Sequence, residues 1–136
     1  MREEDIYAPL FGVGFSLGAN ILLKYLGERG HNVPFRAVVS VHNPYNFILC
    51  SQHIEKELFG IYDRALGSNL KNKVRANRET LKVVEETTSI RLDEVLSDKV
   101  KTVRHFDYHY TSRLFNYPTV YEYYRDSSCD RLMLDI

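Results

Sequence analysis

The pentapeptide Gly14-Phe15-Ser16-Leu17-Gly18 constrains the fold most, because it joins two segments of different hydrophobic pattern. Before it, residues 8–15 form an apolar run that is too short for an ordinary helix, which predicts a buried strand. After it, residues 17–28 carry apolar side chains at helical spacing, and Gly27 and Gly30 are typical helix stop signals. The sequence therefore predicts a strand that turns directly into a helix.

A second strand is expected at residues 35–41, which are β-branched and continuously apolar apart from Arg36 and Ser40. Asn43-Pro44 ends it. Strand, helix and strand in succession make one βαβ unit, so the fold class is α/β. The rest of the chain reads as helical and loop-rich. A helix is expected at about 68–87, one or two short helices at 90–100, and a tyrosine-rich helical stretch at 104–125, broken by Pro118.

The motif G-x-S-x-G at a strand-to-helix junction predicts a nucleophile elbow. Such a turn strains the backbone of Ser16 and holds its Oγ away from the sheet. Side chains at positions 14 and 18 would collide across so tight a turn, which explains glycine at both. The N–H of Leu17, at the positive end of the following helix, is placed to donate to an oxyanion. Ser16 and Leu17 are thus the candidate catalytic residues; the alternative is a glycine-rich turn whose serine has no chemical role.

Charge and cysteine content exclude several other classes of protein. The 18 Lys and Arg residues balance the 18 Asp and Glu residues, which argues against a nucleic-acid partner. No window approaches the roughly 18 uninterrupted apolar residues of a membrane span. The charged segment Met1–Asp5 precedes no apolar stretch, which argues against a signal peptide. Cys50 and Cys129 are expected to be reduced thiols, and no Cys/His spacing predicts a metal site, so neither a metal nor another cofactor is expected.

Other residues with chemical potential each have a plainer interpretation. His42 follows the second strand and so lies at the same end of the sheet as Ser16. Among the histidines it is the one candidate for a base that takes the proton of Ser16; the plainer interpretation is a loop histidine with no chemical role. The tyrosines of 104–125 could stack bases or line a pocket, but packing of one part of the fold on another is their more ordinary use. A basic cluster is expected to be a solvated helix face rather than a phosphate site; it consists of Lys71, Lys73, Arg75 and Arg78.

The segment Gly14–Asn20, followed by Leu22–Glu28, resembles the elbow and helix of the α/β-hydrolase superfamily. Within it the resemblance is to the YheT-like branch, the AB hydrolase fourth family, which includes abhydrolase-domain esterases and lipases. Asn43–Asn46 resembles that branch's turn after its sixth strand. Further matches resemble its helical cap and the run into its seventh strand: Phe106-Asp107, Thr111, Tyr123-Tyr124 and Ser127-Ser128.

The resemblance implies a partial α/β-hydrolase fold in one incomplete domain. Residues 1–46 would be the core βαβ unit, 47–130 the helical cap or lid, and 131–136 the start of the next core strand. The chain would be an internal fragment of the family, whose first strands precede Met1 and whose catalytic Asp and His follow Ile136. Asp107 would lie in the cap, where a hydrogen-bonding role is expected. The two core strands would then lack neighbours, leaving bare sheet edges and a thin core.

The resemblance also implies a function. The protein would be a serine hydrolase of carboxylic esters, cleaving short-chain acyl esters or acylglycerol lipids through an acyl-enzyme on Ser16. It would need no cofactor, and its partner would be the ester or lipid substrate. It would lie in the cytoplasm, or at a membrane through a segment outside this chain. The alternative is a non-catalytic fragment or a degenerate copy that lacks the triad acid and base.

Overall fold

A computed structural model of the chain describes residues 8–136, which form two separate contact units. One unit contains the described residues up to Phe47 together with Ser127–Ile136, and the other is Ile48–Asp126. The charged segment Met1–Asp5 lies outside the described residues. The predicted division into core and cap remains an interpretation of these units.

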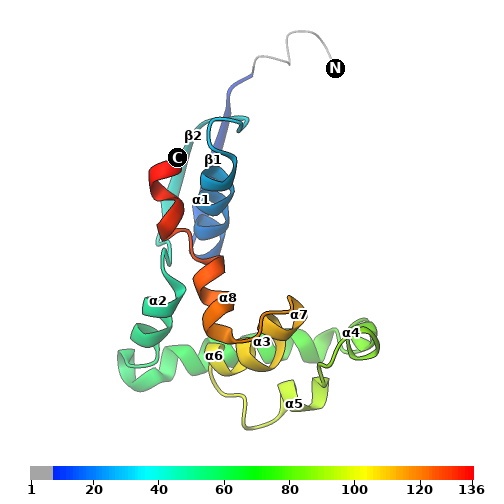
Figure 1. Cartoon of the computed structure of the whole chain (residues 1–136). Helices are drawn as coiled ribbons and strands as arrows, with labels where there is room; N and C mark the ends of the chain where they lie inside the picture. Colours follow the sequence, from blue (N-terminus) through cyan, green and yellow to red (C-terminus); the bar gives the residue numbers. More distant parts are fainter. Residues whose placement is uncertain (1–7) are drawn as a thin grey trace. The chain divides into compact units, whose positions relative to one another are not determined.

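The first unit is built on the predicted βαβ sequence (Figure 1). Strand β1 (Leu10–Phe15) leads through Ser16 into helix α1 (Leu17–Arg29), and strand β2 (Phe35–Val41) returns parallel to β1. The register places Phe15 opposite Val41, so both strands end at the same edge. The prediction of strand, helix and strand is therefore confirmed. A small core between α1 and its neighbours centres on the buried side chains of Leu23, Leu26 and Cys129.

The prediction that both strands are buried is wrong for most of their side chains. Phe11, Val13 and Phe15 of β1 are 60–65% exposed, and Val39 of β2 is 54% exposed. Burial of a parallel strand requires neighbouring strands and a covering layer on both faces. Within the described residues the sheet has two strands, and α1 is the helix that packs on them. The expected bare edges and thin core follow from the same arrangement.

Two glycines of α1 act differently from each other. Gly30 ends the helix with a φ of 54° and donates its N–H to the Leu26 carbonyl at 2.8 Å, as predicted for a stop signal. Gly27 lies inside the helix, so its prediction as a stop signal is wrong. A Cβ at Gly27 would lie 2.4 Å from the Cβ of Leu132. Gly27 therefore allows the C-terminal segment to pack closely on α1.

That segment is the 3₁₀ helix η4 (Asp130–Asp135), which contacts α1 (Figure 1). Residues 131–136 were expected to begin a strand, and the structure corrects this. A strand needs a sheet edge that donates and accepts backbone hydrogen bonds. Here the segment packs against the surface of α1 at Gly27 instead, and helical turns satisfy its backbone groups locally.

The second unit is helical, and its described residues contain no strand. Its elements are α2 (Phe47–Ile54, which begins at the unit boundary), η2 (Glu57–Gly60), α3 (Ile61–Ala76), α4 (Lys82–Thr87), α5 (Leu92–Leu96), α6 (Val103–Phe106), the π-helical turn η3 (Asp107–Thr111), α7 (Ser112–Leu114) and α8 (Val120–Ser127). Its core is formed by Val74, Ile90, Leu92, Val95, Val100 and Phe106. Over residues 8–136, no helix combines the length and apolar character of a membrane span.

The helix expected at 68–87 is two helices. Helix α3 begins at Ile61 and ends at Ala76, and α4 begins at Lys82. At the end of α3 the side-chain amide of Asn77 donates to the Lys73 carbonyl at 2.8 Å. This side-chain hydrogen bond competes with the backbone hydrogen bonds that would continue the helix, and the spacing of apolar residues does not reveal it. Apolar side chains from both helices and from the residues between them nevertheless share one core; they are Leu70, Val74, Leu81 and Val84.

Candidate functional site

Ser16 lies at the junction between β1 and α1, in a backbone conformation that few residues adopt. Its φ is 50° and its ψ is −124°, and the residue is exposed. The N–H of Ser16 donates to the Val41 carbonyl at 2.9 Å, which ties the turn to the end of β2. The carbonyl of Ser16 accepts from the N–H of Ala19 at 3.0 Å and of Asn20 at 3.3 Å, which starts the helix. Such strain persists only where the surrounding structure enforces it.

Gly14 is required by the close approach of α1 to the end of β1. A Cβ on Gly14 would lie 2.6 Å from the Ala19 Cα and 2.8 Å from the Gly18 carbonyl oxygen, both backbone atoms. The expectation that Gly18 is needed for the same reason is wrong. A Cβ on Gly18 would meet no atom within 4 Å among the described residues. The crowding is one-sided, because residue 14 faces the backbone of the helix whereas position 18 lies on its exposed surface.

Leu17 is the first residue of α1, and the N–H groups of a first helical turn have no partner within the helix. These groups carry the positive end of the helix dipole. The N–H of Leu17 directly follows Ser16, and both residues are exposed. If Ser16 Oγ bonded to a carbonyl carbon, the carbonyl oxygen would become negatively charged. The Leu17 N–H lies beside that position and could donate a hydrogen bond to this oxygen.

His42 lies just beyond β2, and the register of the strands places it at the same edge of the sheet as Ser16. It is exposed and has a φ of 51°, a left-handed conformation that is uncommon for histidine. Within residues 8–136, no hydrogen bond joins Ser16 Oγ to His42 or to a carboxylate. The structure thus shows a serine with a strained backbone, an adjacent N–H donor and no engaged base in the described part of the chain.

Asp107 lies in the second unit, at the start of the π-helical turn η3. Its carboxylate accepts hydrogen bonds from Thr111 Oγ1 at 2.6 Å and from Tyr124 Oη at 2.7 Å. The expected hydrogen-bonding role of Asp107 is therefore confirmed. Burial raises the pKa of Asp107 despite these two donors. Burial, with the neighbouring Asp107 carboxylate, also raises the pKa of Tyr124.

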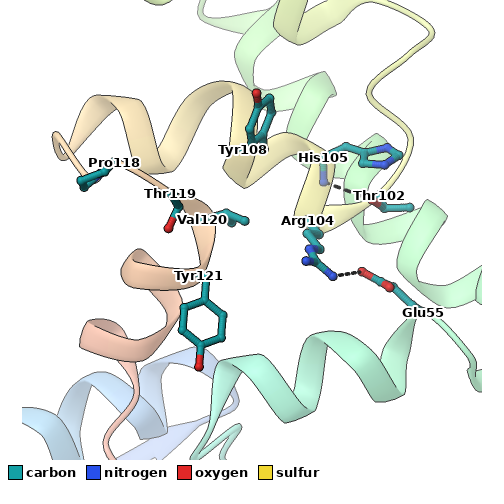
Figure 2. A pocket seen from close by; sticks show the side chains of 9 residues that line it. All are labelled: Glu55, Thr102, Arg104, His105, Tyr108, Pro118, Thr119, Val120 and Tyr121. Carbon is teal, nitrogen blue, oxygen red and sulfur yellow. Dashed lines mark hydrogen bonds and ion pairs between the residues drawn. The ribbon is translucent and has the colours of Figure 1, made fainter.

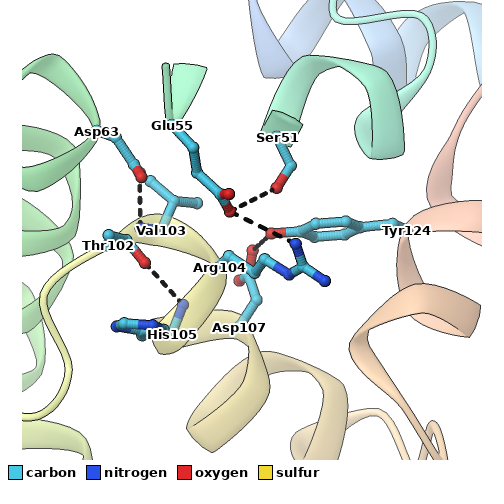
Figure 3. A network of polar contacts seen from close by, with 9 residues as sticks. All are labelled: Ser51, Glu55, Asp63, Thr102, Val103, Arg104, His105, Asp107 and Tyr124. Carbon is cyan, nitrogen blue, oxygen red and sulfur yellow. Dashed lines mark hydrogen bonds and ion pairs between the residues drawn. The ribbon is translucent and has the colours of Figure 1, made fainter. Parts of the chain in front are cut away.

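Polar contacts around the start of α6 hold Asp107 and its neighbours in place (Figure 3). Asp63, from α3, is 1% exposed and accepts from the Val103 N–H at 2.9 Å. The hydroxyl of Thr102 accepts from the His105 N–H at 3.1 Å and caps the same helix. The sequence did not single out Asp63, since an isolated aspartate in a helical segment carries no distinctive pattern.

A hollow of about 660 Å³ lies in the second unit (Figure 2). The aromatic rings of Tyr108 and Tyr121 line it, and the Arg104–Glu55 ion pair, 3.6 Å between Nη1 and Oε1, lies on its wall. Its remaining lining residues are Thr102, His105, Pro118, Thr119 and Val120. This wall matches the prediction that some tyrosines of 104–125 line a pocket.

Other tyrosines of the same stretch pack on one another. The ring of Tyr123 lies 5.5 Å from that of Tyr117 and 5.7 Å from that of Tyr124, measured between centroids. Tyr117 also donates to the Asp126 carboxylate, and this hydrogen bond raises the pKa of Tyr117 to about 12. The tyrosine-rich stretch therefore serves packing and pocket lining at once.

The remaining candidates have ordinary structural roles. Lys71 Nζ donates to the carbonyls of Ser97 at 2.6 Å and Val100 at 3.0 Å, and Arg78 pairs with Asp93 at 2.7 Å. Neither Cys50 nor Cys129 is in a disulfide, in keeping with the expected reduced thiols. No group of three or more His, Cys, Asp or Glu side chains in the described range could hold a metal ion.

These observations define the class of the protein. It is a mixed α/β protein whose parallel strands flank a serine at a strand-to-helix turn, followed by a helical region, and this is a partial α/β-hydrolase fold.

Comparison with known proteins shows which proteins the chain is similar to. The chain is 32% identical to "Phospholipase ABHD3" of Bos taurus over 95% of its length, 36% identical to "Monoacylglycerol lipase" of Saccharomyces cerevisiae over 94%, and 35% identical to "Putative esterase YheT" of Escherichia coli over 94%. The chain is thus similar, over nearly its whole length, to part of esterases and lipases of the α/β-hydrolase superfamily. It spans 30%, 28% and 36% of these relatives, respectively. No protein-family model and no solved structure matches it.

Proposed function

We propose that the protein containing this chain hydrolyses carboxylic esters, with Ser16 as the nucleophile. The observation that carries the proposal is the exposed Ser16 at φ 50° and ψ −124°, between the end of β1 and the first N–H groups of α1. This is the arrangement that a nucleophile elbow requires. The names of relatives as phospholipase, monoacylglycerol lipase and putative esterase support the same class of reaction.

The proposed reaction has two steps. Ser16 Oγ attacks the carbonyl carbon of the ester, the hydroxyl proton passes to a base, and the N–H of Leu17 donates to the resulting oxyanion. The bond from carbon to the alkoxy oxygen then breaks, and the alcohol leaves with the proton. A water molecule then gives a proton to the base while its oxygen attacks the acyl carbon. The bond from that carbon to Ser16 Oγ breaks, the carboxylic acid leaves, and the proton from water passes from the base to Ser16.

Short-chain acyl esters and acylglycerol lipids are the proposed substrates. An apolar acyl chain requires a lined hollow, and the one between Tyr108 and Tyr121 in the second unit supports a role for residues 47–130 as a cap that selects the acyl chain. The base is left open. His42 follows β2 at the same sheet edge as Ser16, so it is one candidate for the base.

Hydrolysis of p-nitrophenyl butyrate and of a monoacylglycerol by the complete protein tests the proposal. We expect Ser16→Ala to lower kcat at least about 10³-fold. Ser68→Ala removes an exposed helical serine of the second unit and serves as the control, with kcat unchanged. A Ser16→Ala variant with wild-type turnover would refute the proposal.

A second function is favoured by one specific observation, the absence of a base bonded to Ser16 in the described part of the chain. Without a base the hydroxyl stays protonated and reacts slowly. The chain would then be a non-catalytic hydrolase copy. Complete protein that is folded but hydrolyses neither ester would support this alternative.

A further inference from the structure

The side chain of Asn20 joins the first part of α1 to a segment far away in the sequence. Its Nδ2 donates to the Ser127 carbonyl at 2.8 Å, and its Oδ1 accepts from the Cys129 N–H at 3.1 Å. Asn20 is 2% exposed, so both hydrogen bonds are shielded from water. Losing either end of this amide would leave a buried polar group without a partner.

The same segment is fastened to the loop that follows β2. The N–H groups of Cys129 and Asp130 both donate to the Tyr45 carbonyl at 3.1 Å, and the Phe47 N–H donates to Ser128 Oγ at 2.9 Å. Residues 127–130 therefore hold α1 on one side and the loop after β2 on the other.

These contacts close a ring around the serine turn. Helix α1 connects Ser16 to Asn20, and hydrogen bonds connect Asn20 to Cys129 and Cys129 to Tyr45. The backbone connects Tyr45 to Val41, whose carbonyl accepts from the Ser16 N–H at 2.9 Å. We name these five residues the Ser16 ring. A strained residue keeps its conformation only when several contacts fix it, and the Asn20 amide makes two hydrogen bonds that join α1 to residues 127–129.

We propose that Asn20 is a positioning residue for Ser16, acting through the Ser16 ring and not through contact with the substrate. The inference rests on the proposed function of Ser16. By joining α1 to residues 127–129, Asn20 fixes the first turn of α1, with its Leu17 N–H, against the sheet edge where β2 ends. A nucleophile and an oxyanion donor must keep a fixed geometry to within a fraction of an ångström, which is why support behind them affects turnover.

The test uses the complete protein with three variants. Asn20→Ala removes both hydrogen bonds, and Asn20→Asp keeps the acceptor for Cys129 but loses the donor to Ser127. Asn46→Ala is the matched control, because Asn46 Nδ2 donates to Asp130 Oδ2 at 2.6 Å and so anchors the same segment to the loop after β2 instead of to α1. The measurements are kcat and KM for p-nitrophenyl butyrate, the rate of fluorophosphonate labelling at Ser16, and the thermal midpoint.

We expect Asn20→Ala to lower kcat and the labelling rate about 10- to 100-fold, with KM within about twofold of wild type. Asn20→Asp should also lower kcat, because a carboxylate oxygen would face the Ser127 carbonyl with no donor between them. Asn46→Ala should lower the thermal midpoint by a similar amount yet keep kcat within about threefold. This contrast separates positioning from simple stabilisation of the fold.

Equal kcat losses per folded molecule in Asn20→Ala and Asn46→Ala would overturn the inference, and so would wild-type kcat in Asn20→Ala. If Asn20→Ala does not fold, Asn20→Asp carries the test, and its full activity would overturn the inference as well. Failure of the proposed function looks different, since turnover would then survive Ser16→Ala.

Discussion

Replacing Gly14 by alanine should destabilise the protein more than the same change at any other glycine near the serine turn. The added Cβ would lie 2.6 Å from the Ala19 Cα, 2.8 Å from the Gly18 carbonyl oxygen and 2.9 Å from the Ala19 nitrogen. All three are backbone atoms, so no side chain can rotate away to relieve the overlap. Overpacking typically costs 1–3 kcal/mol, and a clash with backbone belongs at the upper end, about 3 kcal/mol.

Gly18→Ala is the matched control. Its Cβ would meet no described atom within 4 Å, and alanine is favoured over glycine in a helix by up to about 1 kcal/mol. Urea unfolding of the complete protein, followed by circular dichroism, should therefore separate the two variants by about 3–4 kcal/mol. Equal unfolding free energies would refute the reasoning that α1 and β1 approach each other at Gly14.

Three further predictions concern titratable groups whose pKa is shifted mainly by loss of contact with water. Burial raises the pKa of Asp107, so folding favours the protonated acid. As pH falls from 7 towards 4, the thermal midpoint of the wild type should therefore rise relative to that of Asp107→Asn; a difference in midpoint that does not change with pH would contradict this. Burial, with the nearby Arg113, lowers the pKa of His109, so folding favours the neutral imidazole. Below about pH 6.5 the wild type should therefore lose thermal stability relative to His109→Gln, and thermal midpoints of the two proteins that change equally with pH would count against this. Burial raises the pKa of the Cys129 thiol, so iodoacetamide should modify Cys50 in native protein but Cys129 only after unfolding, as peptide mass mapping would show; native labelling of Cys129 would disprove its burial.

The strand, turn and helix around Ser16 could be predicted because their signals are local. The spacing of apolar residues, the spacing of Gly14 and Ser16, and the helix-ending Gly30 are each recognised within a few residues of the sequence. The predicted role of Gly18 failed because crowding depends on where a Cβ points, and the spacing of glycines does not report that direction.

What could not be predicted depends on distant neighbours. Phe11 and Val39 lie in apolar runs typical of buried strands, yet both are exposed. Their burial would need neighbouring strands and covering helices, which a short apolar run does not specify. Leu132 was expected in a strand and packs instead on α1 at Gly27, more than a hundred residues away in the chain. The hydrogen bonds of Asn20 could not be predicted for the same reason, because its partners lie at the other end of the sequence.

The most direct test of the central claim, that Ser16 is a nucleophile, is the site of covalent modification by a fluorophosphonate. The complete protein is incubated with the probe, digested and mapped by mass spectrometry. We expect an adduct on the peptide that contains Ser16, and no adduct there in Ser16→Ala. A folded protein that hydrolyses esters while Ser16 stays unmodified would contradict it.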